Sequence, residues 1–218
     1  MTLTYELYWS FRSPYSYMIM SRLVALERDF DVRGTIRPVY PLAVRTPEFF
    51  ETRDALWFSY FMVDVHREAA FLGLPFRWPR PDPVQMDFAT RTYPKEQPHI
   101  HRLTRLGALA AELGRGLAYL DEVSRVIWSG DVDNWPEGGH LDRAAERAGL
   151  DPGEMNARVE AEADRLHAVI EESQVAQRAA GHYGVPMIAF GGEPFFGQDR
   201  FDQFRWRLEQ HGLTRRPG

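Results

Sequence analysis

The sequence predicts an α/β fold in which a long helical segment interrupts a small sheet. Strand-like segments occur near the two ends of the chain, whereas the segments between residues 52 and 180 have the apolar spacing of helices. Glycine and proline separate most of these segments, as expected of turns. A chain of 218 residues can bury a sizeable core, so we expect one core with a large helical insertion.

The first forty residues have a strand–helix–strand pattern. Residues 4–10 alternate and are rich in aromatic side chains, which is typical of a strand. Ser13 and Pro14 then mark the start of a helix, because serine caps helices and proline fits their first position. We expect this helix to end near residues 29–31, and a second β-prone stretch follows within residues 32–40. The pattern predicts two parallel strands joined by a helix.

The middle of the chain is expected to be helical. The apolar spacing predicts helices at residues 52–72, 100–113, 117–128, 141–148 and 155–180. Between the first two of these helices, residues 77–98 contain too many prolines for a regular element. We therefore expect an irregular loop there.

The end of the chain returns to β-structure. Residues 185–190 and 193–196 are predicted to form a hairpin, because Gly191-Gly192 between them is a tight-turn signal. A last helix is predicted at residues 199–211. The β-α-β and β-β-α halves together make a thioredoxin-like core. We assign residues 1–45 and 182–218 to this core and residues 46–181 to an inserted all-helical domain.

The composition excludes several classes of function. The chain has no cysteine, which excludes disulfide chemistry, cysteine-based metal sites and a catalytic thiol of its own. Any reactive sulfur must therefore arrive on a ligand. The net charge of −5 argues against a nucleic-acid partner. No stretch is apolar for long enough to span a membrane and no signal peptide is evident, so we expect a cytoplasmic protein.

Three motifs resemble a known family. They lie at residues 9–17 around Ser13-Pro14, at residues 60–76, and at residues 184–200, which include Gly184-Val185-Pro186 and Gly197-Gln198-Asp199. Together they resemble the DsbA-like thioredoxin superfamily, and within it the family of 2-hydroxychromene-2-carboxylate isomerases and kappa-class glutathione transferases. Redox members of the superfamily carry Cys-X-X-Cys in the first motif. Here Ser13 and Ser16 stand at the two cysteine positions.

The resemblance implies a glutathione site. Ser13 would stabilise the glutathione thiolate, helped by the free amides and the dipole of a helix N-terminus. It also implies a cis Val185–Pro186 bond that leaves the Val185 backbone free to pair with a peptide-like ligand. The cofactor-binding positions implied are Val185, Pro186, Gln198 and Asp199. Tyr15 and Arg67 would contact a small aromatic carboxylate, with Arg67 holding the carboxylate.

The resemblance implies a glutathione-dependent cis–trans isomerase similar to 2-hydroxychromene-2-carboxylate isomerase. Such an enzyme would act in aromatic compound degradation and would need no metal. One alternative is a kappa-like glutathione transferase, and another is a cysteine-free DsbA-like binding protein without catalysis. Two departures favour the last: Trp57 replaces an expected lysine, and Val84-Gln85-Met86 replaces an asparagine–serine pair. A homodimer is also consistent with the resemblance.

Each candidate residue also has a purely structural interpretation. Ser13 alone predicts a helix cap, and Asp64 with Arg67 predicts an exposed ion pair on one helix face. Pro186 fits a trans proline of an edge strand, and Gln198 or Asp199 fits a helix cap. Tyr15 fits the core. The residues alone leave both interpretations open.

Overall fold

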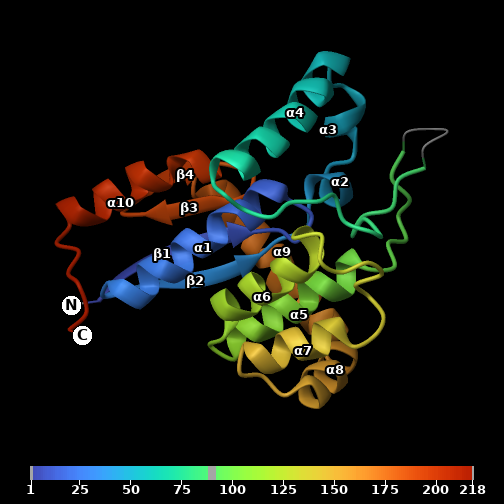
Figure 1. The fold of residues 1–218 in the computed structure, drawn as a ribbon. Helices are drawn as coiled ribbons and strands as arrows, with labels where there is room; N and C mark the ends of the chain where they lie inside the picture. The colour runs from blue at the N-terminus through green and yellow to red at the C-terminus, as the bar shows by residue number, and fades with distance from the viewer. Residues whose placement is uncertain (1, 88–91, 218) are drawn as a thin grey trace.

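The computed structural model describes residues 2–87 and 92–217 of the chain. Within these residues the sheet has four strands in the order β2-β1-β3-β4 (Figure 1), namely β1 (Leu3–Trp9), β2 (Val32–Pro38), β3 (Met187–Phe190) and β4 (Glu193–Phe196). β1 and β2 are parallel, and the other two pairings are antiparallel. The predicted parallel pair at the start of the chain and the hairpin near its end are both confirmed.

Helices cover both faces of this sheet. α1 (Pro14–Asp29) connects β1 to β2, and α10 (Phe201–Gln210) follows a short 3-10 turn at Gln198–Arg200. They pack on the face that carries Tyr5, whose ring meets Phe204 of α10 at 5.2 Å. Side chains alternate along a strand, so Tyr8 points to the opposite face. There it packs with residues of α9 (Ala163–Ala179).

The remaining helices follow β2 in chain order, namely α2 (Leu42–Arg45), α3 (Glu48–Glu51), α4 (Ala55–Phe71), α5 (Ile100–Glu112), α6 (Gly116–Trp128), α7 (His140–Arg147) and α8 (Pro152–Ala161). Figure 1 shows α5 to α8 gathered on one side of the sheet, with α4 projecting away from them. Trp128 joins this group to the turn between β1 and α1, because its indole N–H donates to the Phe11 carbonyl oxygen at 2.9 Å and its ring is fully buried. No helix in the described part of the chain is both long and apolar enough to span a lipid bilayer.

One prediction of local structure was wrong, and two short helices were missed. The expected helix at residues 155–180 is two helices, which meet at Glu162. Arg158 and Arg165 both donate to the Glu162 carboxylate, an arrangement that apolar spacing does not reveal. The sequence also gave no signal for α2 and α3, because four-residue helices are too short to show a period. The predicted loop at 77–98 is irregular where it is described, and residues 88–91 lie outside the described residues.

Candidate active site

Ser13 lies at the start of α1 and contacts a loop from the far end of the chain. Its Oγ accepts a hydrogen bond from the Ser16 N–H at 3.2 Å, which confirms the predicted helix cap. The same hydroxyl donates to the carbonyl oxygen of Val185 at 3.3 Å. Capping and contact with Val185 therefore coexist at one residue.

Two backbone donors next to Ser13 are free. The Val185–Pro186 bond is cis, as the resemblance implied. The N–H groups of Val185 and of Tyr15 have no hydrogen-bond partner among the described residues. The Ser13 hydroxyl and the Tyr15 N–H lie at the positive end of the α1 dipole, where an anion is stabilised, and the Val185 N–H belongs to the residue that the hydroxyl contacts.

The turn at Gly197 holds Asp199 beside the cis-proline. The Gly197 N–H donates to the Pro186 carbonyl oxygen at 2.9 Å. Gly197 has φ +101°, and a Cβ built there would collide with the Asp199 carboxylate, so only glycine fits. Asp199 is exposed and pairs with Arg200 at 3.0 Å. The structure thus joins Ser13 to Val185 by a direct contact, and it links Asp199 to Pro186 through Gly197.

Gln198 points away from that group. It is only 4% exposed, and its amide oxygen accepts from Arg22 while its amide nitrogen donates to Glu68 at 2.7 Å. The side chain therefore joins α1, the 3-10 turn and α4. Its role as a glutathione ligand stays a prediction, and the geometry gives its side chain a structural task that sequence did not indicate.

Tyr15 and Arg67 are brought together through a third residue. The Tyr15 hydroxyl donates to Asp64 at 2.5 Å, and Arg67 pairs with the same carboxylate. Arg67 also donates to the Tyr60 hydroxyl at 3.1 Å. Burial, and then the hydrogen bond and charge of Asp64, raise the pKa of Tyr15 well above its usual value. The predicted ion pair of Asp64 and Arg67 is confirmed, and it extends to a residue of the Ser13 turn.

A cluster of aromatic rings adjoins Tyr15. Phe61 meets Tyr15 edge-on at 5.9 Å and stacks on Trp57 at 5.5 Å. From there the ring contacts continue through α3 to Phe49, which meets Tyr183 at 6.1 Å, two residues before Val185. Sequence reasoning missed this cluster. The signal available was the density of aromatic residues between positions 49 and 61.

Sequence reasoning also missed Arg12, the residue before Ser13. Arg12 forms a bidentate ion pair with Asp82, at 3.0 and 2.8 Å, and its guanidinium lies 4.8 Å from the centre of the Trp78 ring. Asp82 belongs to the proline-rich loop. The pair therefore fixes that loop against the turn that carries Ser13.

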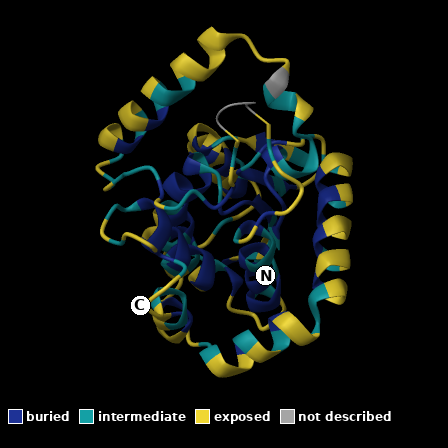
Figure 2. Cartoon of the chain, turned by 90° about the vertical axis from the view of Figure 1, so that its right-hand side faces the viewer, coloured by how far each residue is buried: buried dark blue, intermediate teal, exposed yellow. Residues whose placement is uncertain are grey.

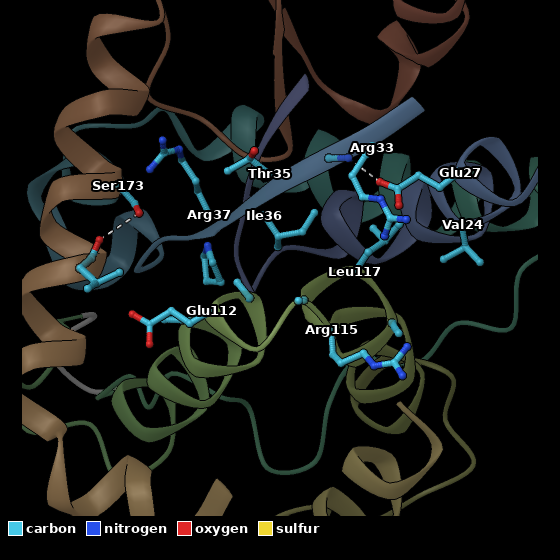
Figure 3. Close-up of a pocket in the computed structure, with 18 of the residues that line it drawn as sticks. Val24, Glu27, Arg33, Thr35, Ile36, Arg37, Glu112, Arg115, Leu117 and Ser173 are labelled. Atoms are coloured by element: carbon cyan, nitrogen blue, oxygen red, sulfur yellow. Dashed lines mark hydrogen bonds between the residues drawn. The ribbon is translucent and has the colours of Figure 1, made fainter. Parts of the chain in front are cut away.

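Other features lie apart from this group. The cavity of about 810 Å³ in Figure 3 follows β2 and is lined by residues such as Arg33, Glu112 and Arg115, and not by Ser13 or Val185. In the described parts of the chain, no three side chains of His, Asp or Glu are placed to hold a metal. His99 and His101, which are close in sequence, pack against Trp135 and Tyr40 respectively.

Comparison with known families decides the classification. The family model for the DSBA-like thioredoxin domain matches residues 4–209. The chain belongs to this family. No curated protein sequence matches it.

Solved structures of DsbA-like proteins share the fold. A 2-hydroxychromene-2-carboxylate isomerase superposes with a TM-score of 0.71 at 19% identity, over 96% of each chain. A probable DsbA oxidoreductase from Streptomyces coelicolor gives 0.66 at 19% identity, over 95% of this chain and 89% of its own. The cytosolic disulfide reductase DsbM from Pseudomonas aeruginosa, solved with GSH, gives 0.60 at 18%, over 96% and 98%. At these identities the likeness shows the fold alone.

The absence of cysteine separates this DsbA-like chain from the disulfide reductases in that group. Thiol–disulfide exchange requires a thiolate as the attacking group. None of the 218 residues can supply one. The chain shares their fold without the residue type on which their named reaction depends.

Proposed function

We propose that this chain is a glutathione-dependent cis–trans isomerase of a small aromatic carboxylate, similar to 2-hydroxychromene-2-carboxylate isomerase, and that it acts in the cytoplasm in aromatic compound degradation. One observation carries the proposal: in a chain without cysteine, the Ser13 hydroxyl at the start of α1 contacts Val185, and neither the Val185 N–H nor the neighbouring Tyr15 N–H has a partner among the described residues. Such a site suits a thiolate that arrives on a ligand. The named activity of one structural neighbour and the GSH bound by another support it.

The residues present fit glutathione in two ways. The free Val185 N–H is a donor that a peptide-like ligand can use. Asp199 presents an exposed carboxylate, is joined to Pro186 through the Gly197 turn, and would bind the α-ammonium group. When bound, glutathione would supply the thiolate that adds to the substrate and later leaves, so that a carbon–carbon bond can rotate.

Ser13 would act as a hydrogen-bond donor to sulfur. Its bond to Val185 is long for a hydroxyl, so the hydroxyl can turn toward an anion at small cost. A hydrogen bond to a charged group contributes about 1.5–3 kcal/mol, which lowers the pKa of a bound thiol by about one to two units. The α1 dipole acts in the same direction. Ser13 would therefore raise the fraction of thiolate at neutral pH.

The aromatic cluster would hold the ring of the substrate. Tyr15, Phe61 and Trp57 present rings beside the Ser13 turn, and offset or edge-on ring contacts are favourable. Arg67 would bind the carboxylate. A guanidinium has five N–H donors, and Asp64 and Tyr60 occupy only part of them.

Thermal unfolding against reduced glutathione tests the cofactor site. At about 100 times its dissociation constant, a ligand stabilises the fold by about 2.7 kcal/mol, and the midpoint should rise by about 5–11 °C. Asp199→Ala should abolish the rise, whereas Asp202→Ala, an exposed aspartate of α10, should keep it. No rise in the wild type at millimolar glutathione would contradict the proposal and favour a binding protein without catalysis.

A further inference from the structure

Two side chains outside the candidate site hold the backbone that leads into the cis-proline loop. Gln177 of α9 is completely buried, and its Nε2 donates to the Gly184 carbonyl oxygen at 2.7 Å. Arg45, the last residue of α2, donates from Nη2 to the Tyr183 carbonyl oxygen at 2.6 Å. In Figure 2 the long helix at the right, α9, has its buried side turned toward the interior. Both carbonyl oxygens before the loop are therefore bound by side chains to which no role has been assigned.

The same two side chains are also joined to each other. Arg45 donates from Nη1 to the Oε1 of Gln177 at 2.8 Å. A guanidinium has donors only, so the amide oxygen of Gln177 must face Arg45 and its amide nitrogen must face Gly184. The hydrogen bonds therefore run in one direction, from the guanidinium through the side-chain amide to the backbone.

This chain of hydrogen bonds ends at the free N–H of Val185. The Gly184 carbonyl and the Val185 N–H belong to one planar peptide unit, which is trans. In a trans unit the two groups point in opposite directions, so the bond from Gln177 directs the N–H away from Gln177. Linked hydrogen bonds also polarise one another, so a donor at the carbonyl oxygen makes the N–H of the same unit a stronger donor.

The backbone groups on either side of this N–H are occupied within the protein. The Gly184 N–H donates to Nδ1 of His182 at 2.8 Å, and the Val185 carbonyl oxygen accepts from Ser13. Between the Tyr183 carbonyl and the Val185 carbonyl, the Val185 N–H is thus the polar group without a partner among the described residues. A donor fixed in this way loses little freedom when a ligand binds, which favours affinity.

We propose that Arg45 and Gln177 are positioning residues, which direct and strengthen the Val185 N–H as a donor to a peptide carbonyl oxygen of glutathione. This inference rests on the proposed function. Burial lowers the pKa of Arg45 to about 10, so the guanidinium keeps its charge at neutral pH. Neither residue would touch the ligand, and the thiolate would depend on Ser13 alone.

Gln177→Glu tests the direction of the bonds, because a carboxylate accepts hydrogen bonds and does not donate them. We expect the dissociation constant of reduced glutathione, measured by calorimetry, to rise about five- to tenfold, the contribution of one hydrogen bond. The pKa of the bound thiol, measured from the ultraviolet absorbance of the thiolate, should not change because Ser13 is intact. An unchanged dissociation constant, or a thiol pKa that also rises as in a general loosening of the site, would overturn the proposal.

Gln174→Glu is the matched control. Gln174 is also a buried glutamine of α9, and its Oε1 accepts from the Tyr40 N–H at 3.2 Å. A carboxylate can keep that bond, so the affinity for glutathione should stay as in wild type. Arg45→Met should weaken binding by a smaller factor than Gln177→Glu. An equal loss in Gln174→Glu would refute the specific role of Gln177, and an unchanged affinity in Arg45→Met would refute that of Arg45.

A measurement without ligand separates this inference from the proposed function. In the full chain labelled with ¹⁵N-valine, the Val185 amide resonance is identified by its loss in Val185→Ile, and the other valine resonances show whether each variant folds. The nitrogen shift responds to the hydrogen bond at the carbonyl of the same peptide unit. We therefore expect the Val185 nitrogen resonance to move upfield in Gln177→Glu and to stay in place in Gln174→Glu.

An unmoved Val185 resonance in a folded Gln177→Glu variant would overturn the proposal, whether or not glutathione binds. A resonance that moves as expected, in a chain whose wild type does not bind glutathione, would instead contradict the proposed function. The two can therefore fail separately.

Discussion

The hydroxyl of Ser13 donates to the carbonyl oxygen of Val185 across 3.3 Å and so joins the first turn of α1 to the cis-proline loop. The two residues are 172 positions apart in the chain. Among the described residues, the backbone N–H of Val185 and that of Tyr15, in the same turn as Ser13, have no hydrogen-bond partner. In the proposed function the start of α1 binds the thiolate of glutathione.

Ser13→Ala and Ser13→Gly together separate the role of Ser13 as a helix cap from its proposed role in stabilising the thiolate. Alanine in place of an N-cap serine costs about 1 kcal/mol of stability, whereas glycine costs only a few tenths. Both remove the hydroxyl that would stabilise the thiolate. We expect kcat/KM at pH 7 to fall about tenfold or more in both variants. The pH at which kcat/KM rises should also be higher, because the bound thiol would lose a hydrogen bond that lowers its pKa. Near-wild-type activity in Ser13→Gly would show that the residue is only a cap.

Alanine substitutions at the adjacent residues Gln198 and Asp199 should have opposite effects: the first on stability, the second on stabilisation by glutathione. Gln198→Ala removes a buried side chain and leaves Arg22 and Glu68 without their shared partner, which should cost about 2–3 kcal/mol in urea unfolding. Asp199→Ala changes an exposed residue and should stay within about 0.5 kcal/mol of wild type while losing the glutathione-dependent stabilisation. An Asp199→Ala variant that still responds fully to glutathione would contradict the assignment of Asp199.

Asp64 should make stability depend on pH. Burial raises its pKa, but the hydrogen bonds from Tyr15 and Arg67 lower it by more, so its pKa in the folded state lies below the usual value. A lowered folded pKa stabilises the protein above the unfolded value of about 3.9, and this contribution is lost as pH falls through the folded pKa.

We therefore expect Asp64→Asn to destabilise the protein at pH 7 and to differ less from wild type at pH 3. Urea unfolding at both pH values measures the difference, and Tyr15→Phe should reduce the same pH-dependent contribution because it removes one of the two hydrogen bonds. An equal difference in the free energy of unfolding between Asp64→Asn and wild type at pH 3 and at pH 7 would contradict a lowered pKa of Asp64.

Arg67 should determine the affinity for the carboxylate substrate. Arg67→Gln keeps hydrogen-bonding groups but removes the charge, and we expect KM to rise about tenfold, close to 1.4 kcal/mol, with little change in kcat. Arg53→Gln is the control, because Arg53 is also exposed near the start of α4 but lies over the Phe49 ring. An equal rise of KM in both variants would indicate a general charge effect rather than a specific contact.

Local signals in the sequence predicted more of the fold than of the site. Ser13-Pro14 marked the start of α1 because the cap and the proline act on their own turn. The Arg22–Gln198–Glu68 network could not be predicted, because its partners are 176 and 130 residues apart and meet only in the folded chain. The same holds for the path of rings from Tyr15 to Tyr183. The candidate site residues were identified because their motifs resemble those of a family. The contacts that fix their side chains form only when the chain packs, so the sequence did not show them.

The most direct test of the central claim is turnover of a 2-hydroxychromene-2-carboxylate by the purified chain, with and without reduced glutathione, while total glutathione is measured. The proposed mechanism predicts that isomerisation requires glutathione and leaves its total amount unchanged, because the thiolate that adds to the substrate is released again. Net loss of glutathione would indicate a transferase. Turnover that does not need glutathione, or no turnover at millimolar glutathione, would contradict the role assigned to Ser13.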